Sequence, residues 1–406
     1  MLKLAFNFIY CLLLLLPFIK TTNLYCGNLD NLGHLIGSRD AVLVVDPKGH
    51  IIFSKNEDTQ LIPASTLKIF TALVALHYLG PDYKFFTEFY VDRHSNLKIK
   101  GYGDPLLISE AVAEMIHNLS MKLGVKYRII NDLVLDDSYF SPRTKIPGVN
   151  VSYEPYDAPN GALCVNFNTV KFKHNKNGVY ISAESQTPLL SFILPRVKAS
   201  QMDHGRIVLS HQRNEITLYA GHLFLYFLEN EGIRIKGNIR LGKIQKKEDK
   251  LIYRHVSRFS LNQTLSKLLE YSNNFIANQL LIASGIKAYG PPGNLEKGVR
   301  AALIYAKDIL KIDHVQFVEG SGISRKNKIS ALDFYKILAA FMPHYFLMQQ
   351  TDNMYYKTGT LKGIHTRAGY IKKKNGELYP FVVMINTPGK SPKSMMDIIQ
   401  RELNYR

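Results

Sequence analysis

A serine and a lysine three positions apart, Ser65 and Lys68, lie near the start of the apolar run LIPASTLKIFTALVAL. At the first turn of a helix, backbone N–H groups and the helix dipole favour a developing oxyanion, and residues three apart share a face. A free lysine has a pKa of about 10.4, but burial can lower it by up to about 3 to 5 units. The pair could therefore supply a serine nucleophile and a neutral amine as its base.

The S-x-x-K pattern also has an ordinary structural explanation. A serine before a helix is a common N-cap, and the stem of a first-turn lysine can lie along an apolar face. The pattern recurs at Ser95, in an expected turn before a strand, and at Ser284, where a helix is expected to end at Gly285. Of the three serines, only Ser65 opens a predicted helix.

Two further stretches strengthen the catalytic interpretation. Ser272-Asn273-Asn274 lies between two predicted helices, and Lys357-Thr358-Gly359 lies on a predicted late strand. A glycine beside a nucleophile lets a substrate approach the backbone closely. Each tripeptide is unspecific alone, but the ordered triple S-x-x-K, S-x-N and K-T-G is typical of penicillin-binding proteins and class A β-lactamases.

The elements that must position these residues are strands at both ends of the chain with helices between them. Alternating and apolar runs predict strands at 41–46 and 50–55, a helix at about 64–79, helices at 262–271, 274–284, 295–309 and 331–342, strands at 354–360, 364–371 and 378–386, and a terminal helix at about 392–403. Such an order predicts one antiparallel sheet assembled from distant segments.

The intervening residues, 84–242, are predicted to form an inserted accessory region rich in short strands. Strand-like runs include EITLYAG at 215–221, and helices are expected at 109–123 and 222–231. With 46% hydrophobic and 21% charged residues in 406 positions, the chain is globular rather than disordered or fibrous.

Longer stretches extend the similarity beyond short motifs: GYGDPLL from Gly101, DLVLDDSYF from Asp132, YDAPNGALCVNFNTV from Tyr156, EGSGISRKN from Glu319 and RAGYIKKKNGELYPFVVMIN from Arg367. Over nearly all of its mature length the chain resembles the class C low-molecular-mass penicillin-binding proteins, the D-alanyl-D-alanine carboxypeptidase/endopeptidases. The resemblance implies an α+β fold, in which a β-lactamase/transpeptidase-like domain has an antiparallel sheet flanked by helices and a strand-rich accessory region inserted after the nucleophile helix.

The expected division is a signal peptide at 1–22, a catalytic domain at 27–83 and 243–406, and an accessory region at 84–242 with one or two subdomains. Lys3 and the apolar run 4–18 suit a secretory signal better than a membrane span of about 20 residues, although an uncleaved anchor stays open. Export, to the periplasm, is the expectation.

By the resemblance, Ser65 is the acyl-enzyme nucleophile, Lys68 is its base, and Ser272 relays a proton towards the leaving amine. Asn274 would orient Lys68 and the substrate amide. Lys357 would supply positive potential.

The substrate-binding residues implied by the resemblance are Thr358, Gly359 and Thr360. The two threonines would hold the terminal carboxylate, and the backbone N–H groups of Ser65 and Thr360 would form the oxyanion hole. Two positions depart from the family pattern, since Asn278 replaces a usual acidic residue and Glu319 replaces a usual Asp before GSG.

Charge and cysteine content limit the partners. A formal charge of +18 fits acidic cell-wall polymers or anionic lipid surfaces, and hence peripheral association with a wall or membrane. Nucleic-acid binding is not expected, because no motif for it occurs. Cys26 and Cys164 could pair or stay free, and the absence of zinc-like spacing predicts no metal and no cofactor.

The predicted function is that of a serine-type D-Ala-D-Ala carboxypeptidase acting on peptidoglycan stem peptides, with cross-link endopeptidase activity left open and β-lactam antibiotics as covalent inhibitors. The alternatives are a serine β-lactamase and a catalytically silent wall-binding protein of the same fold. The long interval from Ser65 to Ser272 favours the peptidase, since an isolated β-lactamase domain needs no such insert.

Overall fold

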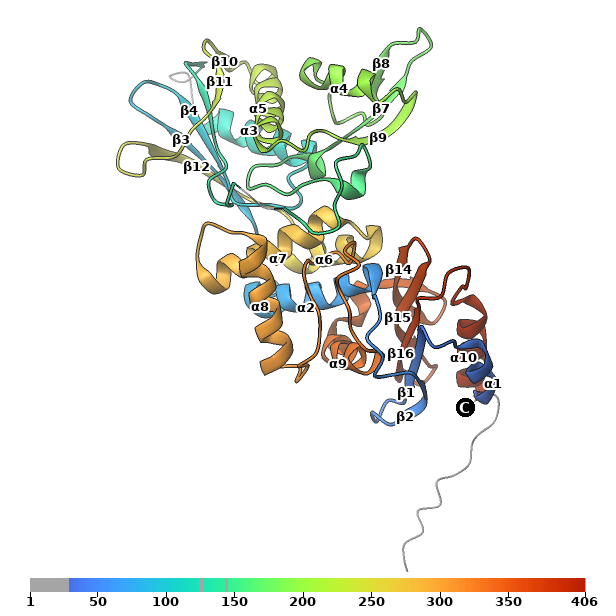
Figure 1. Ribbon diagram of the computed structural model, residues 1–406. Coiled ribbons are helices and arrows are strands. Elements are labelled where there is room, and N and C mark those ends of the chain that lie inside the picture. Colours follow the sequence, from blue (N-terminus) through green and yellow to red (C-terminus); the bar gives the residue numbers. More distant parts are fainter. Residues whose placement is uncertain (1–28, 124–127, 143–144, 406) are drawn as a thin grey trace, which may run out of the picture.

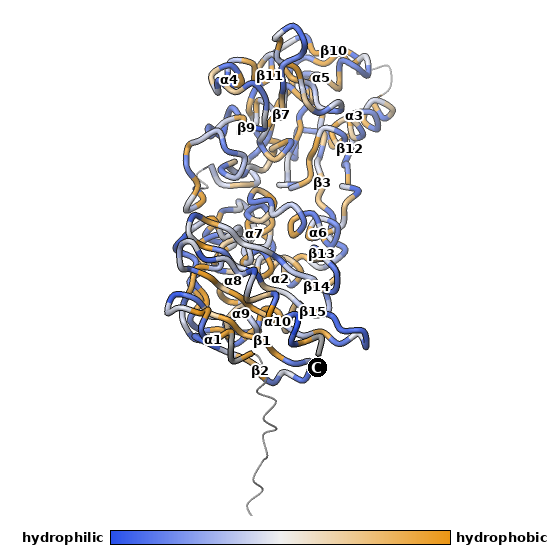
Figure 2. Tube along the Cα trace, turned by 90° about the vertical axis from the view of Figure 1, so that its right-hand side faces the viewer, coloured by the Kyte–Doolittle hydropathy of each residue, from blue (hydrophilic) through white to orange (hydrophobic). Residues whose placement is uncertain are grey.

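The computed structural model describes residues 29–123, 128–142 and 145–405. Two bodies are stacked along the long axis of the molecule, a lower one that holds both ends of the described chain and an upper, strand-rich one (Figure 1). Apolar segments occur in both bodies (Figure 2). The expected signal peptide at 1–22 and Cys26 lie outside the described residues. Among the helices that are described, none is long and apolar enough to cross a bilayer.

The lower body is built on a six-stranded sheet with the order β13-β14-β15-β16-β1-β2. Every neighbouring pair is antiparallel, and the two ends of the chain meet where Val42 pairs with Val383. This confirms the predicted sheet of distant segments. The strands are β1 (Asp40–Val45), β2 (Ile51–Lys55), β13 (Gln349–Thr351), β14 (Met354–Leu361), β15 (Ile364–Lys372) and β16 (Leu378–Ile385).

Helices cover both faces of this sheet (Figure 1). Alternate residues of β1 point to opposite faces, so that Leu43 joins the larger core and Val42 joins the smaller one. The larger core packs against α2 (Lys68–Leu79), α6 (Leu261–Tyr271), α7 (Asn274–Tyr289), α8 (Leu295–Asp308) and α9 (Ala331–Phe341), and the smaller one against α1 (Asp30–Leu35) and α10 (Lys393–Tyr405). Burial on both faces explains why β1 is apolar from Ala41 to Val45.

The helix that was expected to end at Gly285 continues to Tyr289, and this prediction was wrong. A Cβ on Gly285 would lie 2.4 Å from the backbone nitrogen of Gly298 in α8. Gly285 is therefore a close-packing residue inside the helix and not its end. The helix ends at Gly290, whose φ of +75° is left-handed.

The upper body contains a five-stranded sheet with the order β11-β6-β4-β3-β12. The elements of the upper body are β3 (Phe86–Val91), β4 (Leu97–Gly101), α3 (Ser109–Leu123), β5 (Ile129–Ile130), β6 (Leu133–Asp136), β7 (Thr169–His174), β8 (Tyr180–Ser182), α4 (Leu194–Ala199), β9 (His204–Val208), α5 (Arg213–Asn230), β10 (Arg234–Ile235), β11 (Ile239–Leu241) and β12 (Lys250–Val256). One hydrophobic cluster joins the five-stranded sheet, α3, α5 and the smaller β8-β7-β9 sheet.

One prediction about this region needs correction. The run EITLYAG, expected to be a strand, lies inside α5, because buried residues recur at helical spacing, as Ile216, Ala220 and Leu223 show. The five-stranded sheet also includes residues beyond 242, because β12 pairs with β3 from Lys250 to Val256.

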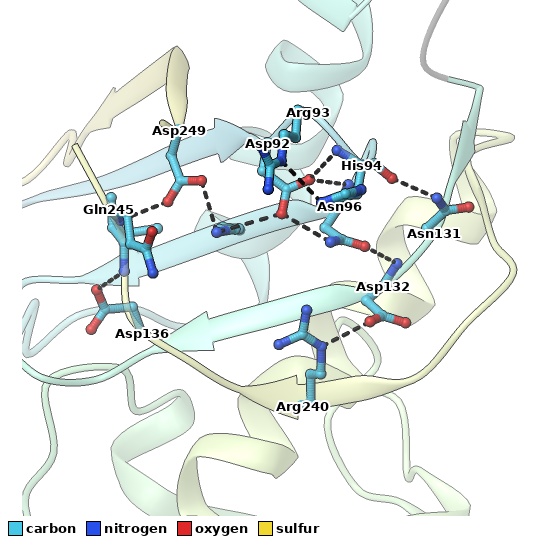
Figure 3. Close-up of polar contacts among 12 residues, drawn as sticks. Asp92, Arg93, His94, Asn96, Asn131, Asp132, Asp136, Arg240, Gln245 and Asp249 are labelled. Atoms are coloured by element: carbon cyan, nitrogen blue, oxygen red, sulfur yellow. Dashed lines mark hydrogen bonds and ion pairs between the residues drawn. The ribbon is translucent and has the colours of Figure 1, made fainter. Parts of the chain in front are cut away.

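Ion pairs and hydrogen bonds between charged side chains link neighbouring segments of the upper sheet (Figure 3). Lys98 Nζ lies 2.7 Å from Asp249 Oδ1 and 3.5 Å from Asp92 Oδ2. Asp132 Oδ2 accepts a hydrogen bond from Arg240 Nε at 2.8 Å. Because each of these carboxylates has a cationic partner, the cluster is a structural clamp on the segments around β4, β6 and β11.

Candidate active site

The predicted nucleophile and base are in hydrogen-bond contact. Lys68 Nζ lies 2.9 Å from Ser65 Oγ, 2.8 Å from Asn274 Oδ1 and 2.7 Å from the carbonyl oxygen of Ser321. The amide and backbone oxygens can only accept hydrogen bonds. A neutral amine has two N–H bonds and one lone pair, so donation to these two oxygens leaves the lone pair for the Ser65 hydroxyl proton.

The surroundings of Lys68 favour this neutral form. Its side chain is fully buried, and burial is the largest cause that holds the pKa of Lys68 well below its usual value. The positive charge of Lys357 lowers this pKa further, whereas the negative charge of Glu319 acts in the opposite direction.

Ser65 is placed by a tight turn, and this differs from the expected helix over 64–79. Residues 64–67 form a 3₁₀ turn, and the α-helix begins only at Lys68. Ala64 has a left-handed φ of 49°, and a Cβ on Gly322 would lie 1.9 Å from its carbonyl oxygen. The backbone around the nucleophile is therefore fixed by close packing against the 320–324 turn.

The S-x-N motif lies at the junction of α6 and α7. Ser272 is the C-cap of α6 and has a left-handed φ of 53°. Asn273 is the N-cap of α7, and its side-chain oxygen accepts a hydrogen bond from the Ile276 N–H at 3.1 Å. Asn274 is thereby the first residue of α7 and reaches Lys68. Among the described residues, no hydrogen bond joins the Ser272 hydroxyl to Ser65 or Lys68.

The K-T-G motif lies on β14 beside the nucleophile. A Cβ on Gly359 would lie 2.8 Å from the backbone nitrogen of Ser65, so a glycine is required for this approach. The neighbour β13 pairs only as far as Tyr356, which leaves this edge of β14 open from Lys357 onward. Thr360 is exposed there and Thr358 is half-buried.

Lys357 is buried, and its ammonium donates to the Thr358 carbonyl oxygen at 2.9 Å. Burial lowers the pKa of Lys357 to about 8. Its charge is therefore lost at a much lower pH than that of a solvated lysine.

A buried carboxylate shapes the turn that supports Lys68, and its role was missed from the sequence. Glu319 is fully buried and accepts six hydrogen bonds: from Ser321 N at 2.7 Å, Ser321 Oγ at 2.6 Å, Gly322 N at 2.7 Å, Ser324 N at 3.2 Å, Asn327 Nδ2 at 2.7 Å and Asn278 Nδ2 at 3.1 Å. This cage fixes the position of the Ser321 carbonyl that accepts from Lys68.

The two departures from the family pattern face each other. Asn278 donates to Glu319 and accepts from the Gly320 N–H at 2.8 Å. An acidic residue at 278 would place two carboxylates together, whereas the amide supplies a donor. Read separately in the sequence, the two departures gave no sign that they form one contact.

The accessory region also reaches the site. Asn274 Nδ2 donates to the Tyr156 carbonyl oxygen at 3.1 Å, which orients its oxygen towards Lys68. Asn160 Nδ2 donates at 2.9 Å both to the Phe275 carbonyl oxygen and to Gln279 Oε1. The segment from Tyr156 to Asn160 thus holds the first turn of α7.

Comparisons with known proteins agree with this geometry. The sequence profile of the D-Ala-D-Ala carboxypeptidase 3 (S13) family matches residues 28–200 and 201–352. A D-alanyl-D-alanine carboxypeptidase from Actinomadura sp. strain R39 is 24% identical, covering 90% of this chain and 81% of its own length. The D-alanyl-D-alanine carboxypeptidase DacB of Haemophilus influenzae is 26% identical, covering 84% of this chain and 83% of its own length.

The crystal structure of penicillin binding protein 4 (dacB) from Haemophilus influenzae has a TM-score of 0.71 and 21% identity, covering 90% of this chain and 94% of that one. The match confirms the predicted α+β fold with its accessory region. Since the profile covers most of the sequence, the prediction of a serine-type carboxypeptidase is confirmed at the family level: the chain belongs to the D-Ala-D-Ala carboxypeptidase 3 (S13) family.

Proposed function

We propose that the chain cleaves the terminal D-Ala-D-Ala bond of peptidoglycan stem peptides through an acyl-enzyme at Ser65. The observation that carries this proposal is the set of contacts at Lys68 Nζ, which fixes both of its N–H bonds on oxygen acceptors and aims its lone pair at the serine. Burial supplies the second requirement, a lysine whose pKa lies below its usual value.

In the acylation step, Ser65 Oγ bonds to the carbonyl carbon of the penultimate D-Ala while Lys68 takes the hydroxyl proton. The backbone N–H groups of Ser65 and Thr360 are the proposed donors to the resulting oxyanion. The tetrahedral intermediate collapses when the C–N bond breaks. The proton then passes from Lys68 to the leaving amine, with Ser272 as the proposed relay.

Deacylation reverses the proton transfers. Water attacks the ester carbon, Lys68 takes a proton from it, and the proton returns to Ser65 Oγ as the ester bond breaks. Asn274 holds Lys68 in place in both steps, since it accepts from Nζ at 2.8 Å. No metal or organic cofactor takes part in this sequence.

The K-T-G strand is the proposed site for the substrate's terminal carboxylate. Lys357 supplies positive potential, and the hydroxyls of Thr358 and Thr360 are available to donate to the carboxylate oxygens. Gly359 keeps the strand close enough to Ser65 for one substrate to reach both.

We extend the proposal to related activities and to location. The Haemophilus influenzae protein has been solved in a complex with a novel β-lactam, and we infer that β-lactams acylate Ser65 here. We also propose that the chain cleaves cross-links and is exported to the periplasm. The charge of +18 would favour peripheral association with the wall or membrane.

We assign residues 29–83 and 257–405 to the catalytic domain and 84–256 to the accessory region, since β12 pairs with β3.

Release of D-alanine from a purified pentapeptide muropeptide tests the proposal. The parent enzyme should release it, and Ser65→Ala should not. Equal release by both would refute catalysis at Ser65, and no release by the parent would favour a silent wall-binding protein. Rapid, sustained turnover of nitrocefin would instead indicate a β-lactamase, because a peptidase should be trapped by the lactam.

A further inference from the structure

A buried threonine lies beside the K-T-G strand on the inner side of the sheet. Thr366 of β15 is directly opposite Gly359 of β14. Its side chain is on the face that packs against the larger core, since Ala368 and Tyr370 belong to that core and alternate residues share a face. Only 2% of Thr366 is exposed. A hydroxyl buried among apolar residues is costly unless it has a hydrogen-bond partner.

The partner of this hydroxyl is the carbonyl oxygen of Pro63, two residues before Ser65. Thr366 Oγ1 lies 2.6 Å from that oxygen, and its contacts with the Gly359 carbonyl oxygen and Thr66 Oγ1 are longer, at 3.4 and 3.5 Å. Because a threonine hydroxyl has one proton, the short distance assigns that proton to Pro63. Thr366 therefore joins the sheet to the turn that carries the nucleophile.

The segment that leads into this turn is held at two successive residues. Thr66 Oγ1 also donates to the Pro63 carbonyl oxygen at 2.6 Å, and the two lone pairs of that oxygen accept both hydroxyls. The side chain of Asn386 accepts from the Ile62 N–H at 2.9 Å and donates to the Ile62 carbonyl oxygen at 3.1 Å. The position of the turn relative to the sheet thus depends on a few named side chains.

Gly359 makes room for the contact between Thr366 and Pro63. A Cβ on Gly359 would collide with the Thr366 hydroxyl and would lie 2.8 Å from the Pro63 carbonyl oxygen. The glycine of the K-T-G motif therefore leaves the space through which Thr366 reaches the nucleophile turn.

We propose that Thr366 is a positioning residue for the oxyanion hole. The two proposed donors are the backbone N–H groups of Ser65 and Thr360. Thr366 holds the segment of the first donor through its hydroxyl and the segment of the second through its pairing with β14. It thereby sets the separation of the two N–H groups, and such donors are effective only at about 2.7 to 3.1 Å from the oxyanion. The inference rests on the proposed function and adds a residue that acts through the backbone, without touching the substrate.

Thr366→Val tests this role, because it removes the hydroxyl and keeps the shape of the side chain. Acylation by penicillin should slow by about tenfold, less than the hundredfold or more that loss of a whole donor costs. A peptidyl boronic acid forms a B–O bond to Ser65 Oγ while Lys68 takes the hydroxyl proton, and the tetrahedral boronate places a negatively charged oxygen in the hole. Its affinity should also fall by about tenfold. The stem pentapeptide, measured by calorimetry in the Ser65→Ala background, should bind equally well with and without Thr366→Val, because it places no charge there.

Three further variants separate positioning from folding. Thr366→Ser keeps the hydroxyl and should restore both acylation and boronate binding. Thr366→Ala removes the hydroxyl without adding a methyl group beside Pro63, and it should show the same losses as Thr366→Val. The matched control is Thr264→Val, since Thr264 is also buried and donates to a backbone carbonyl, that of Ser260 at 3.0 Å, but within α6. It should lower the melting temperature and leave acylation and boronate binding unchanged.

Parent-like acylation and boronate binding in Thr366→Val and Thr366→Ala would overturn the proposal. An equal loss of boronate and pentapeptide binding would also overturn it, because it would indicate a general disturbance of the site. A parent enzyme that forms no boronate adduct at Ser65 would refute the proposed function itself and the inference with it.

Discussion

At the scale of single residues, the proposed site depends on two buried lysines that have different hydrogen-bond partners. Lys68 is fully buried, and its neutral form can donate to the oxygens of Asn274 and Ser321 while its lone pair takes a proton from Ser65. Lys357 is also buried, but its ammonium has a carbonyl partner at 2.9 Å, and burial lowers its pKa only to about 8. One lysine is thus suited to act as a base and the other to attract an anion.

The lowered pKa of Lys68 and the pKa of about 8 for Lys357 predict a bell-shaped pH dependence for carboxypeptidase activity. Activity should rise as Lys68 loses its proton, and should fall above about pH 8 as Lys357 loses the charge that attracts the substrate carboxylate. The measurement is kcat/KM from pH 5 to 10. Lys357→Arg keeps its charge throughout, so its descending limb should move to higher pH, and an unmoved limb would exclude Lys357 as its source.

Substitution of Glu319 should change both the stability of the fold and the pH at which activity rises, which is the ascending limb of the pH profile. Glu319→Gln replaces an oxygen that accepts hydrogen bonds by an NH₂ group, and the donors left unpaired should cost about 1 to 3 kcal/mol of unfolding free energy. It also removes the charge that raises the pKa of Lys68, so the ascending limb should move to lower pH. Thermal unfolding and a pH profile of penicillin acylation measure the two effects.

The sign of that second effect separates two roles for Glu319. Lys68 is faced by Lys357, which lowers its pKa, and by Glu319, which raises it, so loss of the acid must favour the neutral amine. If Glu319→Gln lowers stability but leaves the ascending limb of the pH profile at the same pH, the carboxylate shapes the turn but does not change the pKa of Lys68.

At the scale of elements, close backbone contact explains both packing and one prediction error. Gly285 and Gly298 let α7 and α8 approach closely, and Gly285→Ala should cost about 1 to 3 kcal/mol of unfolding free energy by overpacking. Gly33→Ala in α1 is the control, since among the described residues no atom outside the local helix backbone lies within 4 Å of its added Cβ, and it should be neutral or slightly stabilising. Chemical denaturation measures both, and an equally neutral Gly285→Ala would contradict the packing argument.

Long periodic segments could be predicted from the sequence, because their own residues determine them. The helix expected at 109–123 is α3 (Ser109–Leu123), and the helix expected at 262–271 is α6 (Leu261–Tyr271), which a capping box at Ser260 begins. EITLYAG is too short a window to separate alternation from a helical repeat, and Gly285 signals a helix end unless α8 is known to lie against it.

The site was predictable to the extent that its motifs are local. Ser65 and Lys68 come together through their spacing on one turn, and Asn274 and Lys357 belong to motifs with known order. The cage around Glu319 could not be predicted, because it joins segments that meet only in the folded chain.

At the scale of the whole molecule, the accessory region contributes to the catalytic site and does not only cover it. Through the Tyr156 carbonyl it sets the orientation of the Asn274 amide, and through Asn160 it is fastened to α7. An insert from the middle of the chain thereby positions Asn274, a residue of the proposed catalytic site.

Loosening this attachment should slow acylation. Asn160→Ala removes both donors to α7, and we expect penicillin acylation to fall by about tenfold, the effect of one weakened hydrogen bond. Asn177→Ala, an exposed residue of the β7–β8 turn, is the control and should leave the rate unchanged. Stopped-flow labelling measures the rate, and a parent-like rate in Asn160→Ala would show that the attachment does not position Asn274.

The most direct test of the account is the rate at which labelled penicillin becomes covalently attached to Ser65, measured by peptide mass spectrometry at neutral pH. The account predicts a single adduct at Ser65 in the parent enzyme and a rate lower by about a hundredfold to ten-thousandfold in Lys68→Ala. A Lys68→Ala variant that labels as fast as the parent, or an adduct at another residue, would contradict the central claim that a buried neutral lysine activates this serine.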